Sequence, residues 1–172
     1  MAAATGTGTG GKAAAAAGDA AARVRAVLET VMDPEIPVVS IVDLGMLRRV
    51  EQGADGVIEV VLSPTYTGCP ATDVIRRLVE EALDEAGIRP VRVRYELSPP
   101  WSTDWISEEG RRKLAEYGIA PPALKERADA PVACPRCGSE QTELVSAFGS
   151  TPCKALRRCL SCLEPFEHFK CH

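Results

Sequence analysis

The amino-acid sequence predicts an α+β fold, in which a small three-stranded mixed sheet with packed helices is followed by a short cysteine-rich module. Apolar residues recur at helical spacing in some segments and alternate with polar residues in others. A strand, a helix and a further strand follow one another, and six of the seven cysteines fall in the last forty residues. We therefore divide the chain into a disordered tail (1–18), an α/β domain (19–120), a linker (121–132) and the module (133–172).

Composition narrows the classes of function. The chain has 172 residues, 45% of them hydrophobic, and a formal net charge of −4. The negative charge argues against a nucleic-acid partner, because such proteins usually carry a basic patch. No apolar run reaches the roughly 18 residues of a transmembrane helix, and no secretory signal is evident. Cysteines in Cys-x-x-Cys pairs are typical of metal ligands in a reducing compartment, so we expect a cytoplasmic protein without a membrane partner.

The first expected helix spans residues 19–32. Asp19 is a suitable N-cap, and apolar residues from Val24 to Val31 form one stripe at helical spacing. Pro34 disfavours helical geometry in the residue before it, so the helix should end near Asp33. The preceding residues are low-complexity Ala, Gly and Thr, which bury too little apolar surface to offset the entropy of ordering.

The sheet is expected to use residues 46–51, 57–63 and 91–97 as strands. Residues 52–56 predict a hairpin between the first two of these strands. A helix over residues 70–86, ended by Gly87, connects the second strand to the third. Such a strand–helix–strand crossover makes its two strands parallel. A short helix is expected at residues 107–117, ended by Gly118.

The turn between the second strand and the following helix contains Cys69. Sites collect at the carboxyl ends of strands in such units. With Pro70 at the first helical position, the positive end of the helix would favour the thiolate and lower the pKa of Cys69. The alternative is a small buried residue in a tight corner, which the spacing alone favours.

Three carboxylates lie in the loop after the first helix, which two prolines stiffen: Asp33, Glu35 and Asp43. They are candidate members of a site with Cys69. Asp33 and Asp43 equally suit caps of turns, in which a carboxylate accepts hydrogen bonds from backbone N–H groups.

Both tryptophans of the chain, Trp101 and Trp105, follow the third strand in a Pro-rich loop. We expect one of them to cover the edge of the core. The other is a candidate anchor for a protein partner.

The C-terminal module contains two Cys-x-x-Cys pairs, formed by Cys134, Cys137, Cys159 and Cys162. Each pair fits a tight turn that aims both sulfurs at one ion, and residues 143–147 and 154–158 suit a β-hairpin between the pairs. Four thiolates predict a structural zinc site, whose ion supplies the folding energy that so small a core lacks. An iron–sulfur cluster also suits four thiolates, and a redox role would need only one pair.

Four metal-binding side chains remain outside this set: Cys153, Cys171, His168 and His172. Cys153 lies in a turn that contains Gly and Pro, beside a lysine. It is either a free thiol or a second point of ligation.

Residues 33–37, 42–46 and 65–70 together resemble the small domain of cytosolic iron–sulfur assembly factors. Residues 100–105 and 148–156, with the C-terminal ribbon, resemble one branch of it, the PaaD (also called PaaJ) family of the phenylacetyl-CoA epoxidase system. The resemblance covers nearly everything from about residue 23 onward. It implies a role in aerobic phenylacetate degradation, where a multicomponent di-iron oxygenase epoxidises the ring with electrons from an iron–sulfur reductase.

By this resemblance the chain is a non-catalytic accessory protein that assists cluster or metal-centre assembly in the oxygenase or reductase, which are its expected partners. The resemblance makes Cys69 the reactive cysteine, which holds a transient iron–sulfur cluster alone or across a homodimer, with Asp33, Glu35 and Asp43 in its acidic loop. Fold-level analogy alone does not establish chemistry. A structural or docking subunit without its own chemistry, with Trp101 and Trp105 at the interface, is the main alternative. A nucleic-acid-binding ribbon ranks below it.

Overall fold

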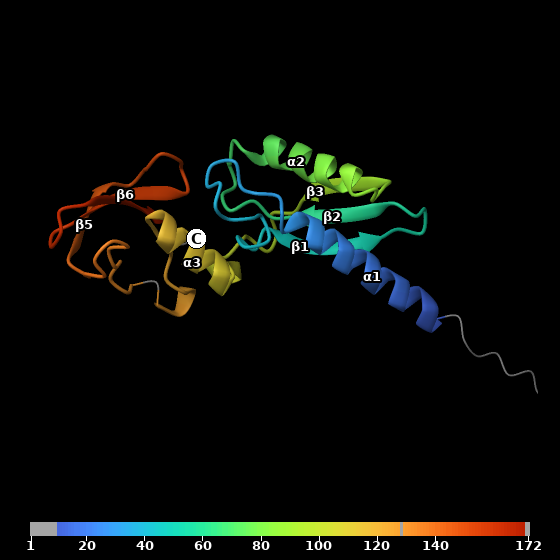
Figure 1. Cartoon of the computed structure of the whole chain (residues 1–172), viewed down its shortest axis with the longest axis horizontal. Coiled ribbons are helices and arrows are strands. Elements are labelled where there is room, and N and C mark those ends of the chain that lie inside the picture. The colour runs from blue at the N-terminus through green and yellow to red at the C-terminus, as the bar shows by residue number, and fades with distance from the viewer. Residues whose placement is uncertain (1–9, 128, 171–172) are drawn as a thin grey trace, which may run out of the picture.

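A computed structural model describes residues 10–127 and 129–170. Figure 1 shows an α/β domain beside a C-terminal β-ribbon, with α3 (Glu108–Tyr117) near their junction. The expected α+β architecture is confirmed. Within the described residues, no helix combines the length and apolarity needed to cross a membrane.

The first helix starts earlier than predicted. Helix α1 spans Gly10–Leu28, so part of the segment predicted to be a disordered tail is helical, while residues 1–9 of that tail lie outside the described residues. The run of alanines before Gly18 explains the difference, because alanine has the highest intrinsic helix propensity. The helix also ends sooner than expected, in a turn where the Thr30 hydroxyl donates to the carbonyl of Val27.

The sheet has the predicted topology. Strand β1 (Leu47–Gln52) pairs antiparallel with β2 (Ile58–Leu62), which pairs parallel with β3 (Val91–Tyr95). Helix α2 (Thr72–Glu85) makes the crossover and contacts β3, while α1 contacts both β1 and α2. The two helices therefore cover the same face of the sheet, as Figure 1 shows.

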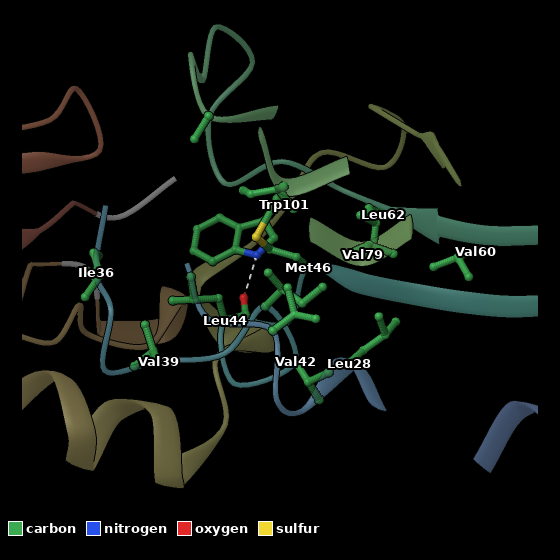
Figure 2. Packing of buried hydrophobic residues seen from close by; sticks show 14 of the residues in the cluster. Leu28, Ile36, Val39, Val42, Leu44, Met46, Val60, Leu62, Val79 and Trp101 are labelled. Atoms are coloured by element: carbon green, nitrogen blue, oxygen red, sulfur yellow. Dashed lines mark hydrogen bonds between the residues drawn. The ribbon is translucent and has the colours of Figure 1, made fainter. Parts of the chain in front are cut away.

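The core lies between this helical layer and the sheet, and it extends under the loop at residues 33–46. Val24 and Leu28 from α1, and Ile75, Val79 and Leu83 from α2, are fully buried. Figure 2 shows the loop residues Ile36, Val39 and Leu44 joining the same cluster. The loop is thus part of the core rather than a solvent-exposed connection.

The C-terminal ribbon is a four-stranded sheet in the order β4-β7-β6-β5, more elaborate than the predicted hairpin. Its strands are β4 (Ile119–Ala120), β5 (Thr142–Ser146), β6 (Lys154–Cys159) and β7 (Pro165–Phe169). The hairpin β5–β6 was expected, whereas β7 and β4 were not. Two short 3-10 helices, η1 (Thr103–Trp105) and η2 (Lys125–Arg127), lie in the connections.

The ribbon is packed against the α/β domain. Strand β4 directly follows α3, which Ser107 caps and Gly118 ends in the left-handed conformation, and it pairs parallel with β7. Phe169 at the end of β7 belongs to the core of the α/β domain. Its ring contacts that of Trp101, with centroids 5.9 Å apart. Residues 119–120 therefore belong to the sheet of the ribbon, and the two modules share one core.

Candidate functional site

A cavity of about 180 Å³ opens where the α/β domain meets the ribbon. One wall comes from the loop after α1 and another from the turn that contains Cys69. The third wall is the turn between β5 and β6. The lining residues are Asp33, Glu35, Ile36, Leu44, Thr65, Tyr66, Cys69, Pro70, Ser150, Thr151, Pro152, Cys153 and Phe169. Three of the four residues that the sequence predicted for the reactive site, Cys69, Asp33 and Glu35, thus share one cavity.

Cys69 is half-buried, and its pKa is raised, not lowered as the sequence predicted. The main cause is desolvation by burial, which the backbone N–H of Ala71 only partly offsets, and the nearby Asp33 carboxylate adds to the increase. Helix α2 begins at Thr72, with Ala71 as its N-cap, so Cys69 precedes the first helical turn. The favourable field of a helix acts mainly within its first turn, and the thiol lies outside it.

Asp33 is the most buried carboxylate of the site, with 7% of its surface exposed. Its Oδ1 accepts hydrogen bonds from the backbone N–H groups of Glu35 (2.8 Å) and Ile36 (2.9 Å), so it caps the turn as the alternative interpretation expected. Desolvation nevertheless raises the pKa of Asp33. No side chain of the described residues forms an ion pair with it. Glu35 is exposed at the rim of the cavity.

Asp43 does not line this cavity. Its Oδ2 accepts a hydrogen bond from the backbone N–H of Ser40 and forms an ion pair with Lys113 Nζ at 2.7 Å. Burial alone would raise the pKa of Asp43, but the hydrogen bonds from Lys113 and Ser40 outweigh it and lower the pKa. Asp43 therefore joins the loop to α3, which separates it from the group of carboxylates predicted from the sequence.

The two tryptophans have different environments. Trp101 is 4% exposed, and its Nε1–H donates to the carbonyl of Leu44 at 2.9 Å, as the dashed line in Figure 2 marks. It is therefore a core residue and is not accessible to a partner, contrary to its place in the predicted interface. Trp105 is half-buried, and the Arg48 guanidinium stacks on its ring, 3.5 Å from the centroid.

Cys153 is the residue that sequence reasoning did not place. It lines the same cavity as Cys69, it packs against the core of the α/β domain, and burial raises its pKa. The sequence signalled only that a cysteine lies in a Gly- and Pro-containing turn. The position of that turn depends on how the ribbon docks, which no local pattern encodes.

The four cysteines predicted as metal ligands converge at the far end of the ribbon. The sulfurs of Cys134, Cys137, Cys159 and Cys162 all lie within 4.8 Å of one another. Two of the separations are 3.8 Å (Cys134 to Cys162) and 3.6 Å (Cys137 to Cys159). Tetrahedral thiolates at about 2.3 Å from a single ion lie about 3.8 Å apart, so the residues present fit a mononuclear metal site.

The knuckles of the ribbon also provide backbone donors to this site. The N–H of Cys162 donates to Cys159 Sγ at 3.5 Å. This bond is the main reason that the pKa of Cys159 falls to about 6. A thiolate is the form that binds a metal, so the local backbone favours the ligating form.

Comparisons with known proteins agree with this division. Residues 119–170 match the family model of the PaaD zinc beta ribbon domain, and residues 21–93 match that of the iron–sulfur cluster assembly protein domain. A protein of Escherichia coli K12, named as a component of 1,2-phenylacetyl-CoA epoxidase, is 50% identical over 149 residues, which are 85% of this chain and 90% of the relative. This chain belongs to the PaaD family.

Relatives of the α/β domain alone are also similar to this PaaD-family chain. An Fe-S protein maturation auxiliary factor of Porphyromonas gingivalis is 39% identical over 88 residues, 51% of this chain and 83% of that protein. The crystal structure of a domain of unknown function (DUF59) from Bacillus anthracis superimposes with a TM-score of 0.54 at 27% identity, covering 59% of this chain and 96% of the other. The cavity residues Ser150 to Cys153 come from the PaaD ribbon, outside the stretch matched to the assembly domain.

Proposed function

We propose that this protein is an accessory factor of the phenylacetyl-CoA ring epoxidase, which assists the assembly of an iron–sulfur cluster or metal centre in the oxygenase or reductase component. It acts in the cytoplasm and has no catalytic activity of its own. The observation that carries the proposal is the position of Cys69, whose half-buried thiol lines a cavity beside a buried carboxylate. The similarity to maturation factors in the α/β domain supports it.

The chemistry of the cavity suits a transient ligand. Cys69 is protonated at neutral pH, because burial raises its pKa. Binding iron replaces that proton, and a thiolate in a partly open cavity remains accessible to a client protein that supplies its own ligands. Cys69 would thus hold the cargo without enclosing it.

The ribbon carries the resident metal of this proposal, a structural zinc ion. All four sulfurs approach one centre within 4.8 Å, whereas a cluster spreads its thiolates over several iron atoms. Cys134 and Cys159 are buried and Cys137 and Cys162 are exposed, so the ion would hold the two knuckles together at the surface.

A docking subunit without its own chemistry is a second candidate, favoured by one observation. Strand β5 forms the edge of the ribbon sheet, and its Leu144 and Val145 side chains are each more than half exposed. Exposed apolar side chains on a sheet edge are typical of a surface that pairs with a partner. Here Trp105 and β5 would contact the oxygenase, and Cys69 would be inert.

The test is the metal content of anaerobically purified protein, for the wild type and Cys69→Ser, together with the maturation of the epoxidase components in cells that carry each variant. We expect about one zinc ion per chain in both proteins, iron or sulfide only with Cys69, and loss of epoxidase maturation in the variant. Full maturation with Cys69→Ser would exclude an assembly role for Cys69. Stable stoichiometric co-purification with the oxygenase would then favour the docking subunit.

A further inference from the structure

The cavity beside Cys69 contains a second thiol, from the other module. Cys153 lies on the turn between β5 and β6, and both cysteines line the same space of about 180 Å³. That volume equals about six waters at roughly 30 Å³ each, more than a bare ion fills. Both cysteines are free thiols of intermediate exposure, and neither belongs to the four-cysteine cluster.

The turn that carries Cys153 is held in place by several contacts. The Cys153 carbonyl accepts a hydrogen bond from the Lys170 N–H (2.9 Å), and Ser150 N–H donates to Glu167 Oε1 (2.6 Å). Glu167 also pairs with Lys154 Nζ at 2.7 Å, and this lysine is only 3% exposed. These contacts tie the turn to β7, which in turn is anchored in the core of the α/β domain through Phe169.

The turn also requires close approach to β7. A Cβ atom at Gly149 would lie 2.6 Å from Glu167 Oε1, so a larger residue there would push this carboxylate away from Ser150. The Thr151 hydroxyl lies 3.0 Å from the Cys153 sulfur and can donate a hydrogen bond to it. A hydrogen bond to sulfur stabilises a thiolate. The position of the thiol is therefore set by the fold before any ligand binds.

The cavity contains a third potential ligand. Only 7% of the Asp33 surface is exposed, its Oδ1 accepts two backbone hydrogen bonds, and no cation of the described residues forms an ion pair with it. The Lys154 ammonium attracts this carboxylate at longer range, but its ion pair is with Glu167. A buried carboxylate without a paired cation is costly, and a bound cation would compensate for it.

We propose that Cys153 and Cys69 together hold one iron centre as cargo, either a ferrous ion or a small iron–sulfur cluster, with Asp33 as an oxygen ligand. The proposal rests on the proposed assembly function and adds that the ribbon supplies half of the cargo site. Each thiol loses its proton to solvent as its sulfur–iron bond forms, so two thiolate charges meet the charge of a ferrous ion. Thiolates bind iron in clusters, and a mixed sulfur and oxygen set leaves positions open for a client.

The test measures iron bound by full-length protein whose ribbon is already loaded with zinc, under anaerobic, reducing conditions. One arm uses Fe²⁺ alone, and the other uses Fe²⁺ with sulfide. The readouts are the dissociation constant by chelator competition and the visible absorption of thiolate-bound iron. The variants are Cys69→Ser and Cys153→Ser. Ser150→Ala serves as the control, because it changes an exposed side chain on the same turn without removing a thiol.

We expect each cysteine variant to weaken iron binding at least about tenfold, the smallest effect seen when even an indirect metal contact is removed, and the control to bind as the wild type does. One zinc per chain in every variant shows that the ribbon remains folded. Iron bound without sulfide identifies a ferrous ion as the cargo, and iron bound only with sulfide identifies a cluster.

The outcomes separate this inference from the proposed function. Loss of iron in Cys69→Ser, with full binding in Cys153→Ser, overturns the two-cysteine site and leaves Cys69 as the cargo ligand. Unchanged binding in Cys69→Ser overturns both proposals, whatever Cys153→Ser does.

Discussion

The four-cysteine cluster of the ribbon and the two-cysteine cavity differ in how their members are brought together. In the ribbon, each pair of ligands lies within one tight turn, and all four sulfurs already lie within 4.8 Å of one another. In the cavity, Cys69 and Cys153 come from different modules, and they meet only because β4, β7 and Phe169 dock the ribbon on the α/β domain.

The difference suggests two kinds of metal chemistry in one chain. A closed set of four ligands encloses an ion and stabilises a fold, as structural zinc sites do. A half-buried pair of thiols in a cavity of about 180 Å³ leaves room for exchange. The first site would retain its metal, and the second would release it. Three experiments test this contrast, in order of decreasing effect.

Removing the ribbon metal should have the largest effect. Structural zinc contributes about 10–16 kcal/mol of binding free energy in small modules, so a strong chelator, or Cys159→Ser, should unfold the ribbon. Loss of amide protection over residues 134–170, followed by hydrogen exchange, is the measurement. Because Phe169 packs in the α/β core, the remaining domain should also melt at a lower temperature. A ribbon that keeps its protection without metal would contradict the structural role of the ion.

Trp101→Ala tests whether the two modules share a core. The substitution removes a ring that is 4% exposed and leaves the Leu44 carbonyl without its donor. We expect a loss of about 3–5 kcal/mol in the free energy of unfolding by urea. Trp105→Ala is the matched control, because that ring is half-buried and loses mainly its contact with Arg48, worth about 1 kcal/mol. Equal losses for the two variants would show that the modules are independent.

Lys113→Met should have the smallest effect, through the loop that forms one wall of the cavity. The Lys113 ammonium holds the pKa of Asp43 below its ordinary value of 3.8, so the pair stabilises the fold above that pH. We expect a loss of about 1 kcal/mol at pH 7. The difference from the wild type should shrink as the pH falls below 3.8 and Asp43 becomes protonated. Urea unfolding at several pH values measures this, and a difference that grows in acid would refute it.

Much of the fold could be predicted because its signals are local. The caps of α3 at Ser107 and Gly118 and the parallel pairing of β2 and β3 agree with the sequence prediction, since cap residues and crossover connections depend on near neighbours. The start of α1 was missed because low complexity was weighed above the helix propensity of alanine. Strands β4 and β7 were missed because a two-residue strand and one that begins at Pro165 have weak local patterns.

The ligand set of the ribbon could be derived without the structure, because Cys134, Cys137, Cys159 and Cys162 lie in two short turns whose spacing brings each pair to one point. The sequence also identified Cys69, although not the rise in its pKa, which depends on burial. Tertiary contacts were needed to place Cys153 beside Cys69, to bury Trp101 and to pair Asp43 with Lys113. Those relations join segments far apart in the chain, and the docking of two modules determines them.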